Sequence, residues 1–187
     1  MKLNLLEYYN ELLESDSTLA KNTQKAYRVN ASFMRKYQKH IGRELQVIDI
    51  DGNFKDAFIK YCREQGYPES TLKGQLGRLK AVCLYAEQRG EIIHNQVKNL
   101  TKNIRVQPTL SVFLTSSEID DIIALNIKDS ALNIARDWLV VSCYIGQRSA
   151  SLFKLTKDNI HIKSNTIRLK QVKTGANVVI PILPQVQ

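Results

Sequence analysis

Residues 138–155 read WLVVSCYIGQRSASLFKL, and a helical apolar run ends inside this segment at Gly146. A single arginine, Arg148, follows among small and apolar residues. Such surroundings predict burial, and a buried charge is costly unless it is paired or holds an anionic ligand. The nearest acids in the sequence are Asp137 and Asp158. Two interpretations stay open for Arg148: an internal ion pair with one of these aspartates, or a reserved site for an anion.

The chain after this segment changes from a helical to an alternating hydrophobic pattern. Apolar residues alternate with polar ones over residues 160–163, 167–170 and 178–182, and turn-forming residues separate the three stretches. Alternation of this kind predicts a three-stranded antiparallel meander with one apolar and one basic face. Lys173 lies at the edge of the second turn. Two interpretations stay open for it: a functional lysine, or an ordinary solvated lysine without a function.

The first hundred residues have the pattern of a small helical bundle. Apolar residues recur at helical spacing in four stretches, 5–14, 22–42, 52–65 and 70–88. Residues 101–113 lack that period and are predicted to be a linker. Thr115 and Glu118 then have the spacing of a capping box, which predicts a helix start.

The predicted domain organisation is therefore bipartite. Residues 1–100 form a helical domain, residues 101–113 the linker, and residues 114–187 an incomplete second domain of two helices and the sheet. The predicted fold class is mainly α, with a four-helix bundle followed by the start of an α+β domain.

Basic residues cluster in stretches that contain no acid. The net charge is +9, and residues 17–43, 70–86 and 159–187 carry lysine or arginine but no aspartate or glutamate. Such a distribution favours a nucleic-acid partner over a merely solvated surface. We predict that DNA is contacted by seven residues: Lys25, Arg28, Lys73, Arg78, Lys80, and Lys102 and Arg105 of the linker.

The fourth helical stretch carries two glycines on the face opposite its leucines. Gly74 and Gly77 each cost about 1 kcal/mol relative to alanine inside a helix. Two interpretations stay open. The glycines allow close packing against another helix, or they allow the helix backbone to approach a DNA duplex.

Several classes of protein are disfavoured. Cys62, Cys83 and Cys143 are odd in number, far apart and in apolar helical contexts, which predicts reduced core residues of a cytoplasmic protein. The histidines lack metal-ligand spacing and no glycine-rich phosphate loop is present, so no metal or cofactor is predicted. No apolar run approaches the length of a membrane span, and the glutamates near the N-terminus argue against a signal peptide.

Four motifs together resemble the tyrosine recombinase (phage integrase) family. They are TSSE at 115–118, YIGQRSASLFKLT at 144–156, DNI at 158–160 and KTGANVVIPI at 173–182. In that family a Gly-x-Arg follows a buried helix, and a Lys-Thr-Gly lies in a hairpin about 25 residues later. Arg148 and Lys173 match those positions.

The resemblance implies a SAM-like helical bundle and the breaking and joining of double-stranded DNA by protomers that act as tetramers on paired sites. A tyrosine attacks the phosphodiester, the arginine matched by Arg148 binds the phosphate oxygens, and the lysine matched by Lys173 protonates the leaving oxygen. Ser151 departs from the pattern, because an acidic residue commonly stands three positions after the arginine.

The family's His-x-x-Arg, its later His or Trp and its nucleophilic tyrosine have no counterpart up to Gln187. The sequence therefore predicts the N-terminal fragment of a recombinase, truncated and inactive in cleavage. The alternatives are a stand-alone protein that occupies recombination sites without chemistry and, disfavoured by the acid-free basic stretches, a helical protein-interaction module.

Overall fold

The computed structural model describes residues 4–15 and 18–186, and the chain divides into two compact units. The first unit is Met1–Thr109 and the second is Leu110–Gln187. Each unit has its own cluster of buried apolar side chains. The chain is therefore mainly helical with one small sheet, as predicted.

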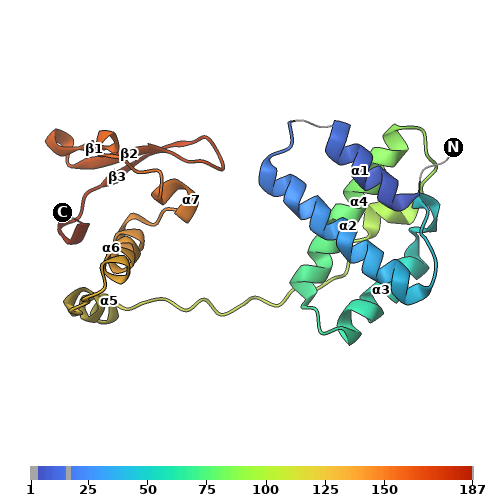
Figure 1. Ribbon diagram of the computed structural model, residues 1–187, viewed down its shortest axis with the longest axis horizontal. Coiled ribbons are helices and arrows are strands. Elements are labelled where there is room, and N and C mark those ends of the chain that lie inside the picture. Colours follow the sequence, from blue (N-terminus) through green and yellow to red (C-terminus); the bar gives the residue numbers. More distant parts are fainter. Residues whose placement is uncertain (1–3, 16–17, 187) are drawn as a thin grey trace. The chain divides into compact units, whose positions relative to one another are not determined.

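The described residues of the first unit form four α-helices and two short 3₁₀ helices (Figure 1). The α-helices correspond to the four predicted stretches, and α1 packs against both α2 and α4. Asp51 starts α3 by accepting a hydrogen bond from the amide of Phe54 at 2.7 Å. The elements are α1 (Leu5–Ser15), α2 (Lys21–Ile41), η1 (Val47–Asp49), α3 (Gly52–Glu64), α4 (Glu69–Gln88) and η2 (Asn95–Asn99).

The core of this unit combines an apolar stripe with a buried polar network. The stripe predicted on the fourth helix, Leu72, Leu76, Leu79 and Cys83, is fully buried. Beside it, three buried polar side chains, Tyr9, Asn30 and Gln75, connect α1, α2 and α4. The Tyr9 hydroxyl donates to Asn30 Oδ1, and Asn30 Nδ2 donates to Gln75 Oε1 at 2.6 Å. Because each buried polar group has a partner, the network avoids the cost of an unsatisfied group.

The packing of the first unit continues into the segment predicted as a linker. Thr101–Asn103 form a turn, and Ile104 is a buried member of the first core. Residues 105–114 have no regular secondary structure, and their side chains are exposed.

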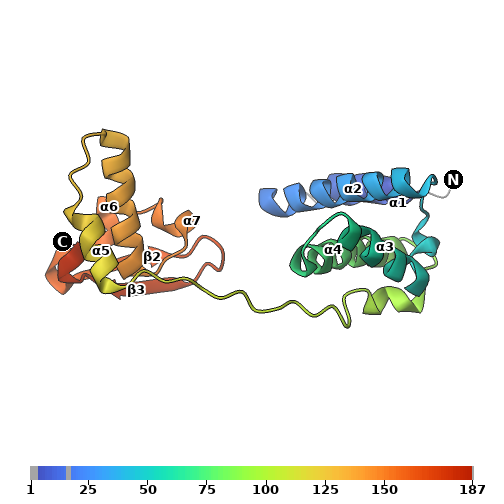
Figure 2. The ribbon, with the colours of Figure 1, turned by 90° about the horizontal axis from the view of Figure 1, so that it is seen from below.

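In the described residues the second unit combines three α-helices with a small sheet, and α5 packs against α6 (Figure 2). The sheet is antiparallel with the strand order β1-β2-β3, which confirms the predicted meander. The elements are α5 (Ser116–Ala124), α6 (Ser130–Ile145), α7 (Ser149–Leu152), η3 (Lys157–Asn159), β1 (Ile160–His161), η4 (Ile162–Ser164), β2 (Thr166–Lys170), β3 (Asn177–Pro181) and η5 (Pro184–Val186).

The two faces of β2 differ as the alternating pattern predicts. Ile167 and Leu169 are buried, whereas Arg168 and Lys170 are exposed. In the register with β3, Arg168 lies opposite Val179 and Lys170 opposite Asn177. The predicted capping box is also confirmed, since the Glu118 amide donates to Thr115 Oγ1 and Thr115 N donates to Glu118 Oε2 at 2.7 Å.

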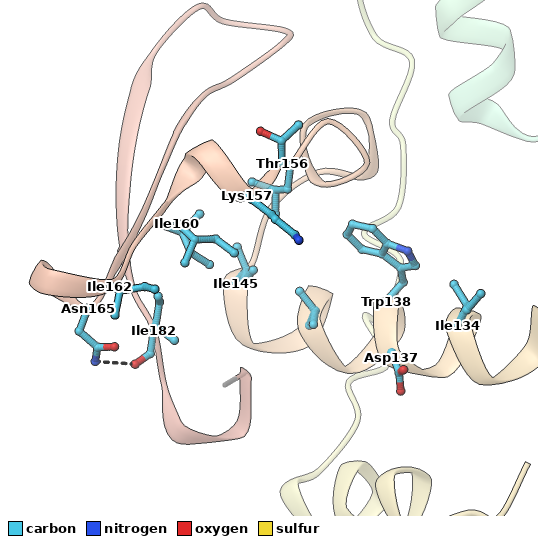
Figure 3. A pocket seen from close by; sticks show the side chains of 13 residues that line it. Ile134, Asp137, Trp138, Ile145, Thr156, Lys157, Ile160, Ile162, Asn165 and Ile182 are labelled. Atoms are coloured by element: carbon cyan, nitrogen blue, oxygen red, sulfur yellow. Dashed lines mark hydrogen bonds between the residues drawn. The ribbon is translucent and has the colours of Figure 1, made fainter.

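The apolar face of the second unit is only partly covered. Its buried cluster consists of Ile145, Leu152, Ile167 and Leu169, while the α6 residues Leu132 and Ile134 are 61% and 57% exposed. Between α6 and the sheet lies an apolar cavity of about 900 Å³ (Figure 3). Its wall includes Trp138 from α6 and several isoleucines from both elements. The apolar helix α6 is therefore only partly buried.

Burial of the three cysteines was predicted, and the structure contradicts this for one of them. Cys62 and Cys83 are buried in the first core, but Cys143 on α6 is exposed. The reason is the partial cover of α6, because a helix that packs on one side only leaves the opposite face in solvent. None of the helices in the described part of the chain combines the length and the hydropathy needed to cross a bilayer.

Candidate functional site

Arg148 lies at a corner between α6 and α7. Helix α6 ends at Ile145 and is followed by the cap residue Gly146, whose φ of +64° is a left-handed conformation that glycine adopts without strain. The chain then turns, and α7 begins directly after Arg148. Glycine is thus needed here so that the chain leaves the helix and brings Arg148 out of the apolar run.

The side chain of Arg148 is exposed, so the expectation of burial is wrong. The alternative interpretation, an internal ion pair, finds no support in the described residues either, because Asp137 pairs with Arg136 at 2.8 Å and Arg148 forms no ion pair with Asp158. Arg148 Nη2 instead donates a hydrogen bond to Gln171 Oε1 at 3.0 Å. The only hydrogen-bond partner of the Arg148 side chain in the described residues is therefore a neutral amide, and most of the guanidinium donors stay available to an anion.

The turn between β2 and β3 carries Lys173. Gln171 closes this turn through its backbone: its N–H donates to the carbonyl of Ala176, and its carbonyl accepts from the N–H of Gly175, both at 2.8 Å. Gly175 has a φ of +70°, which suits its place in the turn. The Lys173 side chain is exposed and forms no hydrogen bond or ion pair within the described residues. Its ammonium is therefore available to a ligand.

Ser151 attaches α7 to the same turn. Its side chain is buried, and its Oγ accepts a hydrogen bond from the N–H of Val172 at 3.2 Å. The backbone N–H of Ser151 donates to the carbonyl of Arg148 at 2.8 Å, but the serine hydroxyl bonds to the hairpin and not to the guanidinium. The helix corner and the turn are thus joined twice, through Ser151 and through Gln171.

Gln171 is the member of the site that sequence reasoning missed. It links the predicted pair, because its oxygen accepts from Arg148 and it lies two residues before Lys173. No motif or spacing marks a glutamine at this position, and its partner is 23 residues away. Only the register of the hairpin against α7 could have revealed it.

The chemistry that this arrangement supports is anion binding by two cations of different kinds. A guanidinium presents a planar fork of donors suited to phosphate oxygens, and a lysine ammonium can bind as a point charge or give up a proton. Across residues 4–15 and 18–186, no three His, Cys, Asp or Glu side chains gather closely enough to hold a metal ion. The apolar cavity of Figure 3 is a separate feature, because neither Arg148 nor Lys173 lines it.

The predicted DNA contacts in the first unit lie on α2 and α4, two helices that pack together. Lys25, Arg28 and Lys73 are exposed, and Arg78 and Lys80 are half-buried. Lys80 Nζ donates to the carbonyl of Lys98 at 2.6 Å, so its ammonium already has one partner. Lys102 and Arg105, beyond the last helix of the unit, are exposed.

The α4 glycines are not in close contact with another helix. A Cβ added at Gly77 would meet only the methyl group of Thr101, at 3.7 Å, which is an ordinary contact. A Cβ at Gly74 would lie 3.3 Å from Nη1 of Arg78, at the far end of a flexible side chain on the same helix. The close-packing interpretation therefore loses its support, and the smooth face of α4 stays open to a ligand.

Comparison with known proteins identifies matches for both units. The model of the phage integrase SAM-like domain matches residues 4–104. Tyrosine recombinase XerC of Roseiflexus sp. (strain RS-1) is 24% identical over 178 residues, covering 92% of this chain and 54% of that protein. The chain thus spans about half the length of this curated relative.

Solved structures of two integrases share the fold. One is the Tn1549 transposon integrase in complex with transposon right end DNA, with a TM-score of 0.79 and 14% identity over 98% of this chain and 62% of that chain. The other is a lambda integrase tetramer bound to a Holliday junction, with a TM-score of 0.73 and 19% identity over 97% of this chain and 52% of that chain. Their likeness confirms the predicted fold class.

Proposed function

Because the chain belongs to the phage integrase family of tyrosine recombinases, we propose that it is the DNA-binding portion of a site-specific recombinase. Both units bind double-stranded DNA. The recombinase acts as a tetramer of protomers on paired DNA sites. The DNA bound in the two similar integrase structures and the acid-free basic stretches of this chain support the proposal. Such a protein acts where the cell keeps its DNA, in the cytoplasm.

Arg148 binds the phosphate at which the strand is broken. A preorganised cation at this point offsets the charge that develops on the non-bridging oxygens in the transition state. The observation that carries this role is the contact of Arg148 with Gln171 at 3.0 Å, which places a solvent-open guanidinium beside the turn of Lys173.

Lys173 is the general acid that protonates the departing 5′ oxygen. A general acid must reach the leaving atom and must not be held by another group. Lys173 is exposed at the tip of a short, internally hydrogen-bonded turn and is held by no other side chain in the described residues, which supports this role.

The nucleophilic tyrosine and the His-x-x-Arg motif lie outside these 187 residues. Two observations support this part of the proposal. The chain spans 54% of its XerC relative, and the apolar face between α6 and the sheet is uncovered, as expected of one part of a larger domain. We therefore expect the 187-residue chain alone to bind DNA without cleaving it.

Salt dependence tests the binding part of the proposal. Each phosphate contact contributes roughly 0.9 to the slope of log affinity against log salt concentration. For binding of a duplex we expect a steep slope, and Lys73→Ala should reduce this slope by about 0.9. The matched control Lys60→Ala removes an exposed lysine of α3, outside the predicted contacts, and should leave the slope unchanged. A flat titration of the unaltered chain would contradict the proposal and favour the protein-interaction module.

Covalent attachment tests the catalytic part in the recombinase that includes the nucleophile. Arg148→Ala should abolish the tyrosyl–DNA product, a loss of roughly 3–4 kcal/mol in transition-state stabilisation, while DNA binding stays nearly intact. Lys173→Ala should regain cleavage on a substrate whose 5′ leaving oxygen is replaced by sulfur, which needs no proton, and Arg148→Ala should not. If no reading frame supplies a tyrosine, the alternative of a stand-alone DNA-binding protein replaces the proposal.

A further inference from the structure

We infer that Gln171 is a positioning residue, which holds the guanidinium of Arg148 in the direction of the DNA phosphate and couples it to the turn that carries Lys173. The inference rests on the proposed function of Arg148 and Lys173. It concerns a residue that lies between them in space and that neither the Gly-x-Arg nor the Lys-Thr-Gly motif includes.

Three hydrogen bonds hold the side chain of Gln171. Its Oε1 accepts from Arg148 Nη2 at 3.0 Å and from Thr174 Oγ1 at 2.9 Å, and its Nε2 donates to Gln147 Oε1 at 2.9 Å. A guanidinium can only donate, so the amide must present its oxygen to Arg148. The amide nitrogen then faces Gln147, and the orientation of the whole side chain is determined.

The backbone of Gln171 is held equally firmly. Its N–H and C=O both bond across the turn, to Ala176 and Gly175. The next residue, Val172, donates its N–H to the buried Oγ of Ser151. A side chain that starts from a fixed backbone and ends in three hydrogen bonds loses little further freedom when it orders Arg148, so the guanidinium is preorganised before a ligand arrives.

The neutrality of the amide is the second part of the argument. A carboxylate beside Arg148 would also orient it, but it would offset the charge that a phosphate needs. The hydroxyl of Ser151, at the position where the family commonly has an acid, bonds to the hairpin and not to the Arg148 guanidinium. Here orientation thus comes from a neutral group on a different element, and the guanidinium keeps its full attraction for phosphate.

Side-chain ¹⁵N NMR of the 187-residue chain tests this role directly, with the Arg148 signals assigned from Arg148→Lys. We expect slowly exchanging Nη resonances for Arg148, lost in Gln171→Met and retained in Gln171→Glu, which preserves the acceptor. The matched control Thr174→Val removes the other hydrogen bond to the same oxygen and should leave the Arg148 resonances in place. Loss in both Gln171→Met and Thr174→Val would overturn the inference, because the turn as a whole would then hold Arg148.

Addition of a mixed-sequence DNA duplex separates this inference from the proposed function. The Arg148 resonances of the unaltered chain should shift with DNA, the shift should be smaller in Gln171→Glu, and no ordered DNA-bound signal should appear in Gln171→Met. Equal shifts in the unaltered chain and in Gln171→Met would overturn the role of Gln171 alone. Ordered Arg148 resonances that DNA never shifts would refute the phosphate site itself, and with it the proposed function of Arg148.

Discussion

Replacing Gly77 by alanine should stabilise the first unit. Gly77 lies inside α4, where alanine is favoured over glycine by about 0.8–1 kcal/mol. The added Cβ would meet only the Thr101 methyl group at 3.7 Å, so no steric cost offsets the gain. We expect the free energy of unfolding to rise by about 0.5–1 kcal/mol. A change of 1 kcal/mol corresponds to roughly 4–8 °C in the melting temperature of a unit this size.

A larger side chain at Gly77 should instead weaken the binding of DNA. Gly77→Gln keeps good helix propensity but adds a long side chain to the open face of α4. If that face lies against the duplex, the affinity should fall roughly tenfold, equivalent to about 1.4 kcal/mol. Stability would be followed by urea unfolding with far-ultraviolet circular dichroism, and affinity by fluorescence anisotropy at constant salt.

The control is a glycine-to-alanine substitution in the same unit, at a glycine whose backbone is left-handed. Gly42 follows α2 with a φ of +69°, and alanine there should cost roughly 1–2 kcal/mol instead of stabilising. Destabilisation by Gly77→Ala would refute the reasoning and restore the close-packing interpretation of α4. Unchanged DNA affinity in Gly77→Gln would show that this face does not approach the duplex.

Three further predictions concern thiols, pH and the linker. Burial raises the pKa of Cys62 and of Cys83 to about 12, so iodoacetamide at pH 8 should label only the exposed Cys143 of the native chain; mass spectrometry of native and denatured samples checks this. Hydrogen bonds from the N-cap residue Thr115 lower the pKa of Glu118. The stability that these bonds give to α5 should therefore be present above the ordinary glutamate pKa and be lost as the pH falls through the lowered pKa. Amide exchange in α5 should show this loss, and Glu118→Gln should remove the pH dependence. Protease cleavage within residues 101–113 should slow when a duplex is added. Equal cleavage with and without DNA would count against contact between the linker and the DNA backbone.

Local patterns in the sequence were sufficient for the α-helices of the first unit and for the order of the three strands, although residues 162–163, predicted as strand, lie in η4. The helical period of the leucines predicted the buried stripe of α4, and alternation predicted which residues of β2 face inward. The capping box of Thr115 and Glu118 was also correct. All of these depend on neighbours within four residues, whose relative positions are determined by the geometry of one helical turn or one strand. The motif pair Arg148 and Lys173 could likewise be read directly, because order and spacing are properties of the sequence.

What surrounds those two cations was decided only by the tertiary structure. The sequence suggested that Arg148 is buried, because its neighbours are apolar, but the left-handed turn at Gly146 brings the guanidinium into solvent. Its partner Gln171 is 23 residues away, and the two meet because Ser151 fixes the hairpin against α7. The exposure of Cys143 has a similar origin, since an apolar helix is buried only on the sides that other elements cover. Composition and periodicity describe a residue's own element, whereas burial and long-range partners depend on how separate elements pack, and that is determined by contacts no local pattern contains.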